Sequence, residues 1–282
     1  MKKKLYLTVK DHTVSGEEFQ LIYNEDLEIL ETSPQPSLEK LPDYYKSEDY
    51  ISHTDNKRNL FEKIYQLVKA ISLKRKLKII NSLSHSNKTL LDIGCGTGDF
   101  LKIAKQDNWS VMGIEPNNRA RTIANKKTNN LVFGNEKLQK LKPKSFDVIT
   151  LWHVLEHLPD FDEQILIFKK LLKPKGILII AVPNYKSYDA KCYQKFWAAY
   201  DAPRHLWHFS KNSISKLADQ NAMKVIKILP LKFDAYYVSL LSEKYKTGIM
   251  NPFKSFWVAW LSNLKAKRNQ EYSSLIYIIK NK

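Results

Sequence analysis

The sequence predicts an α/β fold in which a parallel sheet is wound with helices, preceded by a small β-rich appendage. Three observations predict this class. From residue 89 onward, short apolar runs of β type alternate with helical stretches. A glycine-rich turn joins the first of these runs to the first helix. The first 55 residues differ from the rest, because they hold short alternating segments such as residues 18–23.

The chain divides into an appendage, residues 1–55, and a larger domain, residues 56–282. The appendage holds 12 acidic and 6 basic side chains and contains the loop signal Ser33-Pro34-Gln35-Pro36. Residues 56–88 hold nine basic side chains and one acidic one, and apolar residues recur at helical spacing between positions 60 and 71. They predict a basic amphipathic helix that leads into the larger domain.

Strands and helices are expected to alternate along the larger domain. Strands are expected at residues 89–93, 111–114, 131–133, 146–151 and 176–182, with helices that begin near Asp99, Asn117 and Asp162. A helix at 213–220, a strand at 224–231 and a last strand at 274–279 complete the pattern. We assign residues 185–210 as a lid, and residues 232–273 as an aromatic and basic insertion.

Composition excludes several classes of protein. Of the 282 residues 43% are apolar, enough for a substantial core, while two cysteines are too few for a disulfide framework or a four-thiolate zinc site. The apolar start is cut short at Lys10, and no apolar run could cross a bilayer. We therefore expect a cytoplasmic protein, soluble or associated with a membrane surface. A net charge of +17 favours anionic partners, although charge also serves solubility alone.

The strongest chemical signal is the turn Gly94-Cys95-Gly96-Thr97-Gly98, which joins an apolar strand directly to a helix. Backbone without side chains can lie against a ligand at such a helix N-terminus. Glu115 follows the next strand, 19 residues after Gly96, where doubly wound folds place a carboxylate that accepts hydrogen bonds from ribose hydroxyls. The two features together predict a nucleoside ligand.

The glycine spacing argues against a dinucleotide. Position 99 is Asp where the dinucleotide fingerprint has its third glycine, and the carboxylate of Asp99 would repel a pyrophosphate. A ligand that carries an ammonium and a sulfonium is compatible with carboxylates such as Asp92, because opposite charges attract over a few ångströms.

Four motifs occur in order, at residues 91–98, 113–116, 146–157 and 171–176. Together they resemble the class I S-adenosylmethionine-dependent methyltransferases, and most closely the subgroup that includes quinone-biosynthesis methyltransferases. The resemblance covers about residues 56–282. It implies a Rossmann-like doubly wound seven-stranded sheet, with an antiparallel last strand beside the sixth, and S-adenosylmethionine as the cofactor.

The resemblance also assigns cofactor-binding residues. In the family the glycine turn lines the methionine moiety, the acid before it supports the turn or the amino group, and the acid after the second strand holds the ribose. A residue after the third strand lies near the adenine, and the end of the fourth strand flanks the cofactor. The matching residues here are Asp92, Gly94, Cys95, Gly96, Gly98, Glu115, Pro116, Asn135, Leu151 and Trp152.

Methyl transfer asks little of side chains, because the sulfonium is already a strong electrophile and in-line positioning supplies much of the rate. A base is needed where the acceptor loses a proton. The candidates are His153 and His157 after the fourth strand, and His205 and His208 in the lid. Each can also serve in packing. Residues 201–205 resemble a pattern of the subgroup, which favours His205 and Arg204; Arg204 could pair with an acidic substrate or anchor its own loop.

We expect no metal. Some quinone methyltransferases have Glu in place of His153 and bind a divalent cation in this region, and this sequence departs there. Capping and salt bridges are commoner uses of a His-x-x-Glu-His segment than metal binding.

The insertion and the net charge leave the partner open. Phe253, Phe256, Trp257 and Trp260 stand among lysines, which fits aromatics packed on the main domain, an interfacial helix on an anionic membrane, or a stacking surface for nucleic acid. The leading hypothesis is a methyltransferase for a small-molecule or lipid-like acceptor. The alternatives are an RNA or protein methyltransferase, although the Asn/Asp-Pro-Pro-Tyr motif is missing, and a non-catalytic scaffold, which would need neither the glycines nor Glu115.

Overall fold

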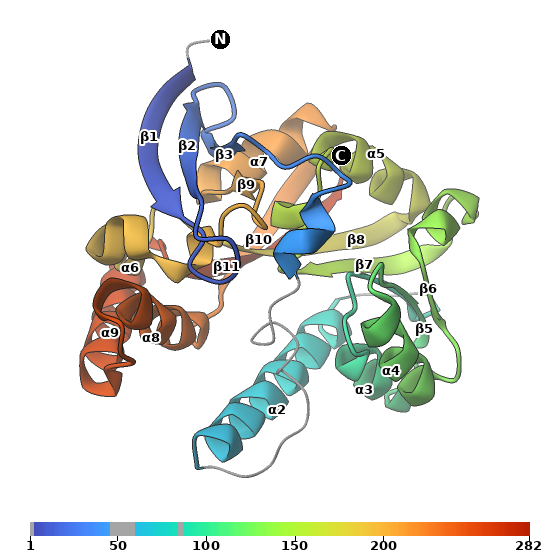
Figure 1. The fold of residues 1–282 in the computed structure, drawn as a ribbon. Helices are drawn as coiled ribbons and strands as arrows, with labels where there is room; N and C mark the ends of the chain where they lie inside the picture. Colours follow the sequence, from blue (N-terminus) through green and yellow to red (C-terminus); the bar gives the residue numbers. More distant parts are fainter. Residues whose placement is uncertain (1–2, 46–59, 84–86) are drawn as a thin grey trace.

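The computed structural model describes residues 3–45, 60–83 and 87–282 of the chain (Figure 1). The expected boundary between appendage and larger domain, at residues 55 and 56, lies outside these described residues. The expected start of the basic helix, before residue 60, lies outside them too.

A seven-stranded sheet forms the centre of the larger domain, in the order β10-β11-β8-β7-β4-β5-β6. β11 is antiparallel to both of its neighbours, β10 and β8, whereas the other pairs are parallel. The fold class expected from the sequence is therefore confirmed, including the antiparallel last strand beside the sixth. The strands are β4 (Thr89–Ile93), β5 (Ser110–Ile114), β6 (Val132–Phe133), β7 (Phe146–Trp152), β8 (Leu172–Pro183), β10 (Met223–Pro230) and β11 (Ser274–Asn281).

The strand bounds agree closely with expectation except at β8, which begins at Leu172 rather than at residue 176. Leu172 pairs with Phe146 of β7, and the register of this pairing shifts before Val148. Residues 172–176 contain Pro174 and Gly176, both of which weaken a strand signal. The sequence pattern therefore does not predict the start of β8, which is set by its pairing with β7.

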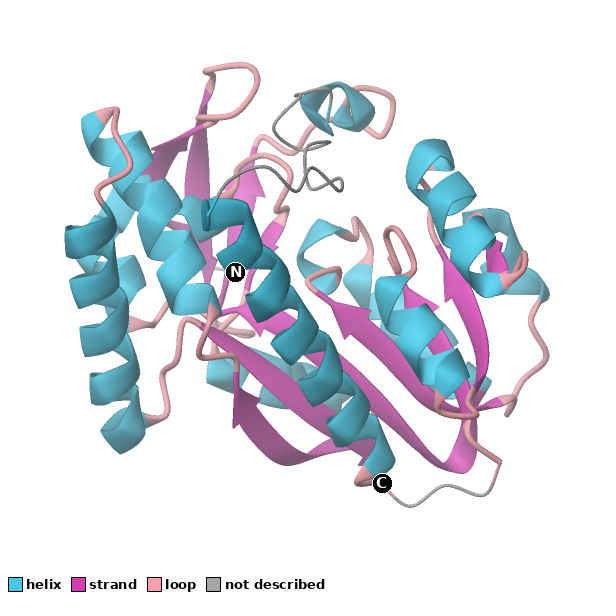
Figure 2. Ribbon diagram, turned by 90° about the horizontal axis from the view of Figure 1, so that it is seen from below, coloured by secondary structure: helices cyan, strands magenta, loops and turns pink. Residues whose placement is uncertain are grey.

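Helices cover both faces of the sheet. One apolar core holds residues of α5 (Phe161–Leu171) and α7 (Lys211–Gln220), and a second holds residues of α2 (Leu60–Asn81), α3 (Asp99–Gln106) and α4 (Asn118–Thr128). Figure 2 shows α2, bounded by grey segments, crossing one face of the sheet. Local chemistry sets the helix ends: the Asn117 side chain accepts hydrogen bonds from the amides of Arg119 and Ala120 at the start of α4.

The appendage forms a second sheet with the order β1-β2-β3-β9. Its strands β1 (Lys3–Lys10), β2 (Glu18–Asn24) and β3 (Ile29–Ser33) come from the N-terminal segment, and β9 (Trp207–His208) comes from the expected lid. A third apolar core joins Leu21 and Leu30 of the appendage to Trp197 and Tyr200 of the lid and to Val258 of the insertion. Appendage, lid and insertion therefore pack as one body at the side of the central sheet (Figure 1).

The lid contains α6 (Tyr188–Tyr193) and short turns of 3₁₀-helix at Gln194–Phe196 and Ala198–Tyr200. The insertion forms a hairpin of two helices, α8 (Asp234–Thr247) and α9 (Pro252–Asn269). Gly248 ends α8 in the left-handed conformation that favours glycine. In the described parts of the chain, no helix has the length and apolar character to cross a membrane.

Candidate functional site

The glycine turn follows β4 and leads into α3. Gly94, Gly96 and Gly98 all have φ between 55° and 76°, in the left-handed region. A Cβ on Gly94 would lie 2.5 Å from the side chain of Val154, and one on Gly98 would lie 2.9 Å from the Cβ of Ala124. A Cβ on Gly96 would meet nothing within 4 Å. Gly94 and Gly98 thus allow close packing, and Gly96 presents bare backbone to open space.

Glu115 lies directly after β5, and its carboxylate turns back onto the glycine turn. Oε2 accepts a hydrogen bond of 2.8 Å from the amide of Gly96, and Oε1 accepts one of 2.8 Å from the amide of Asn117. Burial raises the pKa of this carboxyl, and the two amide donors oppose the rise. A carboxylate can accept about four hydrogen bonds, so both oxygens keep acceptor capacity for further donors such as hydroxyls.

Opposite charges meet where β4 and β7 end. Asp92 is buried, and its Oδ1 accepts a hydrogen bond of 2.5 Å from Oγ1 of Thr150. Burial raises the pKa of Asp92 to about 7. The ammonium of Lys76, on α2, lies 4.6 Å from the ring centroid of Trp152, and burial lowers the pKa of Lys76. Nε1 of Trp152 is buried and has no hydrogen-bond partner among the described residues. An anion, a cation and an unsatisfied donor are therefore gathered here.

The other expected cofactor residues are placed differently. Cys95 lies beside the backbone of Gly113, and burial raises the pKa of its thiol. Pro116 is exposed after Glu115, and Asn135 is exposed at the start of the 3₁₀-helix Asn135–Lys140. Leu151 is fully buried in the core of the sheet. Of this group, Pro116 and Asn135 are open to solvent, whereas Leu151 contributes packing under the turn.

His153 comes directly after β7 with φ at 57°, a strained conformation for a residue with a side chain. Its Nε2 lies 3.0 Å from Oδ2 of Asp234, and its Nδ1 lies 3.4 Å from Oε1 of Glu156. Burial alone lowers the pKa of His153, but the two carboxylates outweigh it and raise the pKa to about 10. His153 is therefore an imidazolium at neutral pH, and an imidazolium cannot accept a proton.

His157 and His205 lie edge to face, with ring centroids 4.6 Å apart. Nδ1 of His157 is 2.9 Å from the carbonyl of Arg204, and Nδ1 of His205 is 2.9 Å from the carbonyl of Ala199. Because a carbonyl only accepts, Nδ1 of His205 carries the proton when the ring is neutral, and its Nε2 keeps a free lone pair. Nδ1 of His157 also lies 3.0 Å from the hydroxyl of Tyr45, which can donate or accept. Burial, with a smaller effect of His157, lowers the pKa of His205 to about 4.

Glu156 completes a small cluster with these two imidazoles. One ligand atom from each of Glu156, His157 and His205 lies within 4.8 Å of the others. Two imidazoles and a carboxylate suit a transition metal by donor type. The carboxylate of Glu156 is buried, and within the described structure neither oxygen has a hydrogen bond. The imidazolium of His153, 3.4 Å away, offsets part of its charge and is shared with Asp234.

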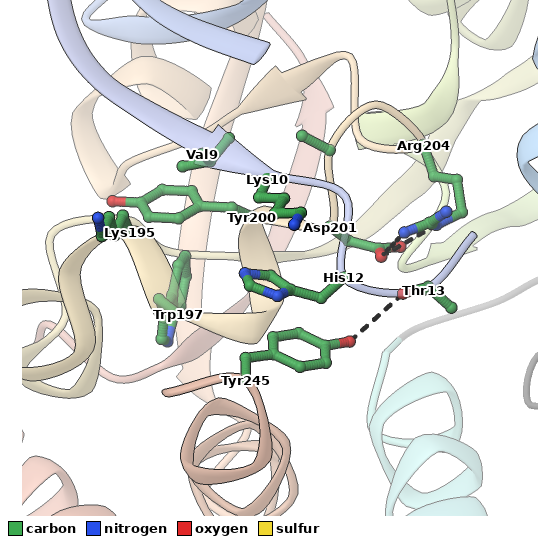
Figure 3. A pocket seen from close by; sticks show the side chains of 11 residues that line it. Val9, Lys10, His12, Thr13, Lys195, Trp197, Tyr200, Asp201, Arg204 and Tyr245 are labelled. Atoms are coloured by element: carbon green, nitrogen blue, oxygen red, sulfur yellow. Dashed lines mark hydrogen bonds and ion pairs between the residues drawn. The ribbon is translucent and has the colours of Figure 1, made fainter. Parts of the chain in front are cut away.

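Arg204 is buried and occupied by protein partners. Its Nη2 lies 2.7 Å from Oδ1 of Asp201 and 3.0 Å from Oδ1 of Asp11, and its Nη1 donates to the carbonyl of Tyr44. Figure 3 shows Arg204 beside a cavity between β1, the lid and α8. This cavity holds about 10 Å³, enough for one water molecule. Arg204 thus joins the appendage to the lid, the anchoring role that its sequence pattern left open.

Two residues of the site carry no local sequence signal. Lys76 belongs to a run of basic residues that reads as the solvated side of a helix. Asp234 lies in the insertion, 81 positions after His153, which it contacts. The packing of α2 and α8 against the end of the sheet brings them to the site, so the local sequence does not predict their place.

The sequence is similar to known methyltransferases. The family model described as "Methyltransferase domain" matches residues 57–228, which is more than half of the chain. Among curated proteins, the ubiquinone biosynthesis O-methyltransferase of Paraburkholderia phymatum is 34% identical over 123 residues, which are 40% of this chain and 53% of that protein. The protein of the same name from Idiomarina loihiensis is 26% identical over 170 residues, which are 56% of this chain and 70% of that protein.

Solved structures show the same fold. A SAM-dependent methyltransferase from Archaeoglobus fulgidus superposes with a TM-score of 0.53 at 18% identity, covering 79% of this chain and 100% of that one. The magnesium protoporphyrin IX methyltransferase of Synechocystis, solved with bound SAH, superposes with a TM-score of 0.57 at 14% identity, covering 87% of this chain and 100% of that one. The sequence match to the Paraburkholderia relative spans about half of that protein's length.

Proposed function

The chain belongs to the class I S-adenosylmethionine-dependent methyltransferases, and we propose that it transfers a methyl group from S-adenosylmethionine to a small-molecule or lipid-like acceptor. The observation that carries this proposal is the pairing of Glu115 with the bare backbone of Gly96 at 2.8 Å. A buried acid with spare acceptor capacity beside open backbone suits a ribose diol. S-adenosylmethionine supplies the activated methyl group.

The residues of the turn fit this cofactor by charge. Glu115 would accept hydrogen bonds from the ribose hydroxyls, and Asp92 would balance the ammonium of the methionine moiety. The carboxylate of the cofactor's methionine moiety would pair with the ammonium of Lys76 and accept a hydrogen bond from the unsatisfied Nε1 of Trp152. Gly96 would provide the cradle. The buried charges and the orphaned donor at this place are of the kind that this zwitterionic cofactor would satisfy.

Further residues complete the proposed cofactor site. Gly94, Gly98 and Cys95 would hold the turn in its shape, and Leu151 would support it from the core. Pro116 and Asn135 would lie toward the adenine, on the exposed side.

His205 and His157 are the proposed bases for an acceptor that loses a proton. His205 is neutral at physiological pH because its pKa is about 4. Its Nδ1 donates to the carbonyl of Ala199, so the lone pair of Nε2 can accept a proton. His153 acts instead as a fixed positive charge, and Arg204 as a positioning residue that holds the lid. A hydroxyl acceptor fits this arrangement, and the similarity to ubiquinone biosynthesis O-methyltransferases supports oxygen as the acceptor atom.

The candidate site and the rest of the molecule also bear on metal content and cellular location. We propose no resident metal, because the His153 imidazolium lies 3.4 Å from Glu156 and would repel a cation bound there. We also propose a cytoplasmic protein that contacts an anionic membrane surface through residues 232–273, and two free cysteines, Cys95 and Cys192, fit a reducing compartment.

The test measures binding and transfer separately. Titration calorimetry with S-adenosylmethionine should give saturable binding that Glu115→Ala weakens about 100-fold, since it removes acceptors for two hydroxyls at roughly 1.5 kcal/mol each. The control is Glu163→Ala, an exposed acid on α5. Transfer of a labelled methyl group into lipid and small-molecule extracts identifies the acceptor. No binding by the wild type, or equal binding by both variants, would refute the proposal.

A further inference from the structure

Helix α9 is amphipathic in the opposite sense from an ordinary surface helix. Its buried face is made of small residues, whereas its exposed face carries large apolar ones. Phe253 is 88% exposed, and Phe256 and Trp257 are 57% and 58% exposed. The buried residues are Ser255, Val258, Ala259, Ser262 and Ala266. Burial in the protein core therefore does not explain the aromatic residues.

The exposed residues form one stripe. Positions 253, 256, 257, 260 and 264 are spaced so that, at about 100° per residue, they fall within a sector of about 100°. The rings of Trp257 and Trp260 stack with centroids 5.0 Å apart, and Phe256 packs against Tyr236 of α8 at 5.4 Å. The stripe is thus a continuous apolar surface rather than a set of scattered side chains.

The turn between α8 and α9 extends this surface. Ile249 is 67% exposed and Met250 is 45% exposed, immediately before Phe253. Asn251 caps α9 by accepting a hydrogen bond from the amide of Lys254, so the tip has a defined shape. We call Ile249, Met250 and the α9 stripe together the apolar tip.

Positive charge surrounds the apolar tip. Residues 232–273 contain seven Lys or Arg and three acids. Of the acids, Glu243 is buried and pairs with Lys254, and Asp234 contacts His153 in the site. α9 itself contains no acid. What faces outward is therefore a combination of aromatic side chains and lysines.

We propose that the apolar tip inserts into the interface of an anionic lipid bilayer. Tryptophan and phenylalanine on one face with lysines beside them match the chemistry of that interface. A second copy of this chain would bring the same positive charge against itself. A nucleic acid would accept the lysines and the stacked rings, but not aliphatic side chains such as Ile249 and Met250.

The hairpin also connects the bilayer to the candidate site. α8 begins at Asp234, whose carboxylate lies 3.0 Å from His153, and it ends at the apolar tip. One rigid helix therefore joins the two places. This step rests on the proposed function: a lipid-like acceptor held in the bilayer would reach the methyl donor from the membrane side, with no need for free diffusion through water.

Vesicle flotation of the full chain tests the membrane surface without cofactor or acceptor. The wild type should float with vesicles of phosphatidylcholine and phosphatidylglycerol, and less with phosphatidylcholine alone. Ile249→Ser/Phe253→Ser/Trp257→Ser should lower the partition coefficient roughly tenfold or more, because it removes the exposed apolar anchors. Lys244→Glu/Lys246→Glu should lower it to a similar extent on anionic vesicles only.

The matched control is Leu166→Ser, an exposed leucine on α5 outside the hairpin, which should leave flotation unchanged. Wild-type flotation that is absent, or that survives both hairpin variants, would overturn the proposal. So would a concentration-dependent dimer in sedimentation that Phe253→Ser dissolves, or RNA binding that the apolar variant abolishes. Because S-adenosylmethionine binding is measured apart from flotation, failure of the membrane surface is distinguishable from failure of the methyltransferase assignment.

Discussion

The candidate site has a proposed cofactor end, around Asp92 and Glu115, and a proposed acceptor end, around the histidines and Arg204, and the two are built in different ways. The cofactor end is local: Asp92, the glycine turn and Glu115 lie within 24 consecutive residues, and the hydrogen bond between Gly96 and Glu115 spans 19 positions. The acceptor end is assembled from distant segments, and its Arg204–Asp11 pair spans 193 positions. Contacts between residues close in sequence thus build the first end, and long-range packing builds the second.

The two ends also differ in charge balance. At the proposed cofactor end, burial raises the pKa of both Asp92 and Glu115 and outweighs the hydrogen bonds and nearby cations that oppose the rise. At the proposed acceptor end each cation lies between two carboxylates, Arg204 between Asp11 and Asp201 and His153 between Glu156 and Asp234. Burial raises the pKa of these four carboxyls, but hydrogen bonds and the nearby cations outweigh it and lower the pKa. A cationic ligand therefore gains most at the cofactor end, whereas the ions of the acceptor end stabilise the fold.

The largest effect is expected at the histidines. His205→Gln should lower kcat about 100- to 10,000-fold with little change in the Kd of S-adenosylmethionine, because a base acts on the acceptor alone. Steady-state kinetics and calorimetry measure the two quantities. His12→Gln, whose ring stacks on Tyr245 beside the small cavity, is the control. A variant that keeps the wild-type kcat, or loses cofactor affinity in parallel, would contradict this division of roles.

The next effect concerns Arg204. Arg204→Met should reduce the free energy of unfolding by about 3–5 kcal/mol, since it leaves buried Asp11 without its cation. Denaturant titration measures this, with Lys224→Met, at an exposed position of β10, as control. Unchanged stability together with lost transfer would instead place the guanidinium against the substrate, and the comparison between the two ends would fail.

Asp92 should show a smaller effect with a defined pH dependence. Its folded pKa, about 7, exceeds the ordinary value of 3.8, so the folded state binds the extra proton and wild-type stability falls as pH rises between these values. The Asp92→Asn variant has no carboxyl to titrate at this position, so its stability does not fall in this way. The free energy of unfolding of the variant, relative to that of the wild type, should therefore rise by about 2 kcal/mol between roughly pH 5.5 and roughly pH 8. Thermal or denaturant unfolding at both pH values decides it, and a constant difference would show that Asp92 has an ordinary pKa.

The smallest effect is expected from chelation. Dialysis against EDTA should leave the transfer rate unchanged, because the imidazolium of His153 lies beside Glu156 and would repel a metal ion there. Elemental analysis of the protein before dialysis provides the check. Stoichiometric zinc or another transition metal, together with activity that returns only when the metal is restored, would show that Glu156, His157 and His205 form a metal site.

The sequence alone determined the central sheet, the glycine turn, the place of Glu115 and the family. These features depend on apolar periodicity and turn chemistry, which act between residues close together in the chain. It did not determine that β9 completes the appendage sheet, that Lys76 and Asp234 reach the site, or that His153 is charged while His205 is neutral. Only the tertiary structure decided these, because burial and the charge of neighbours distant in sequence set a side chain's partners and its pKa.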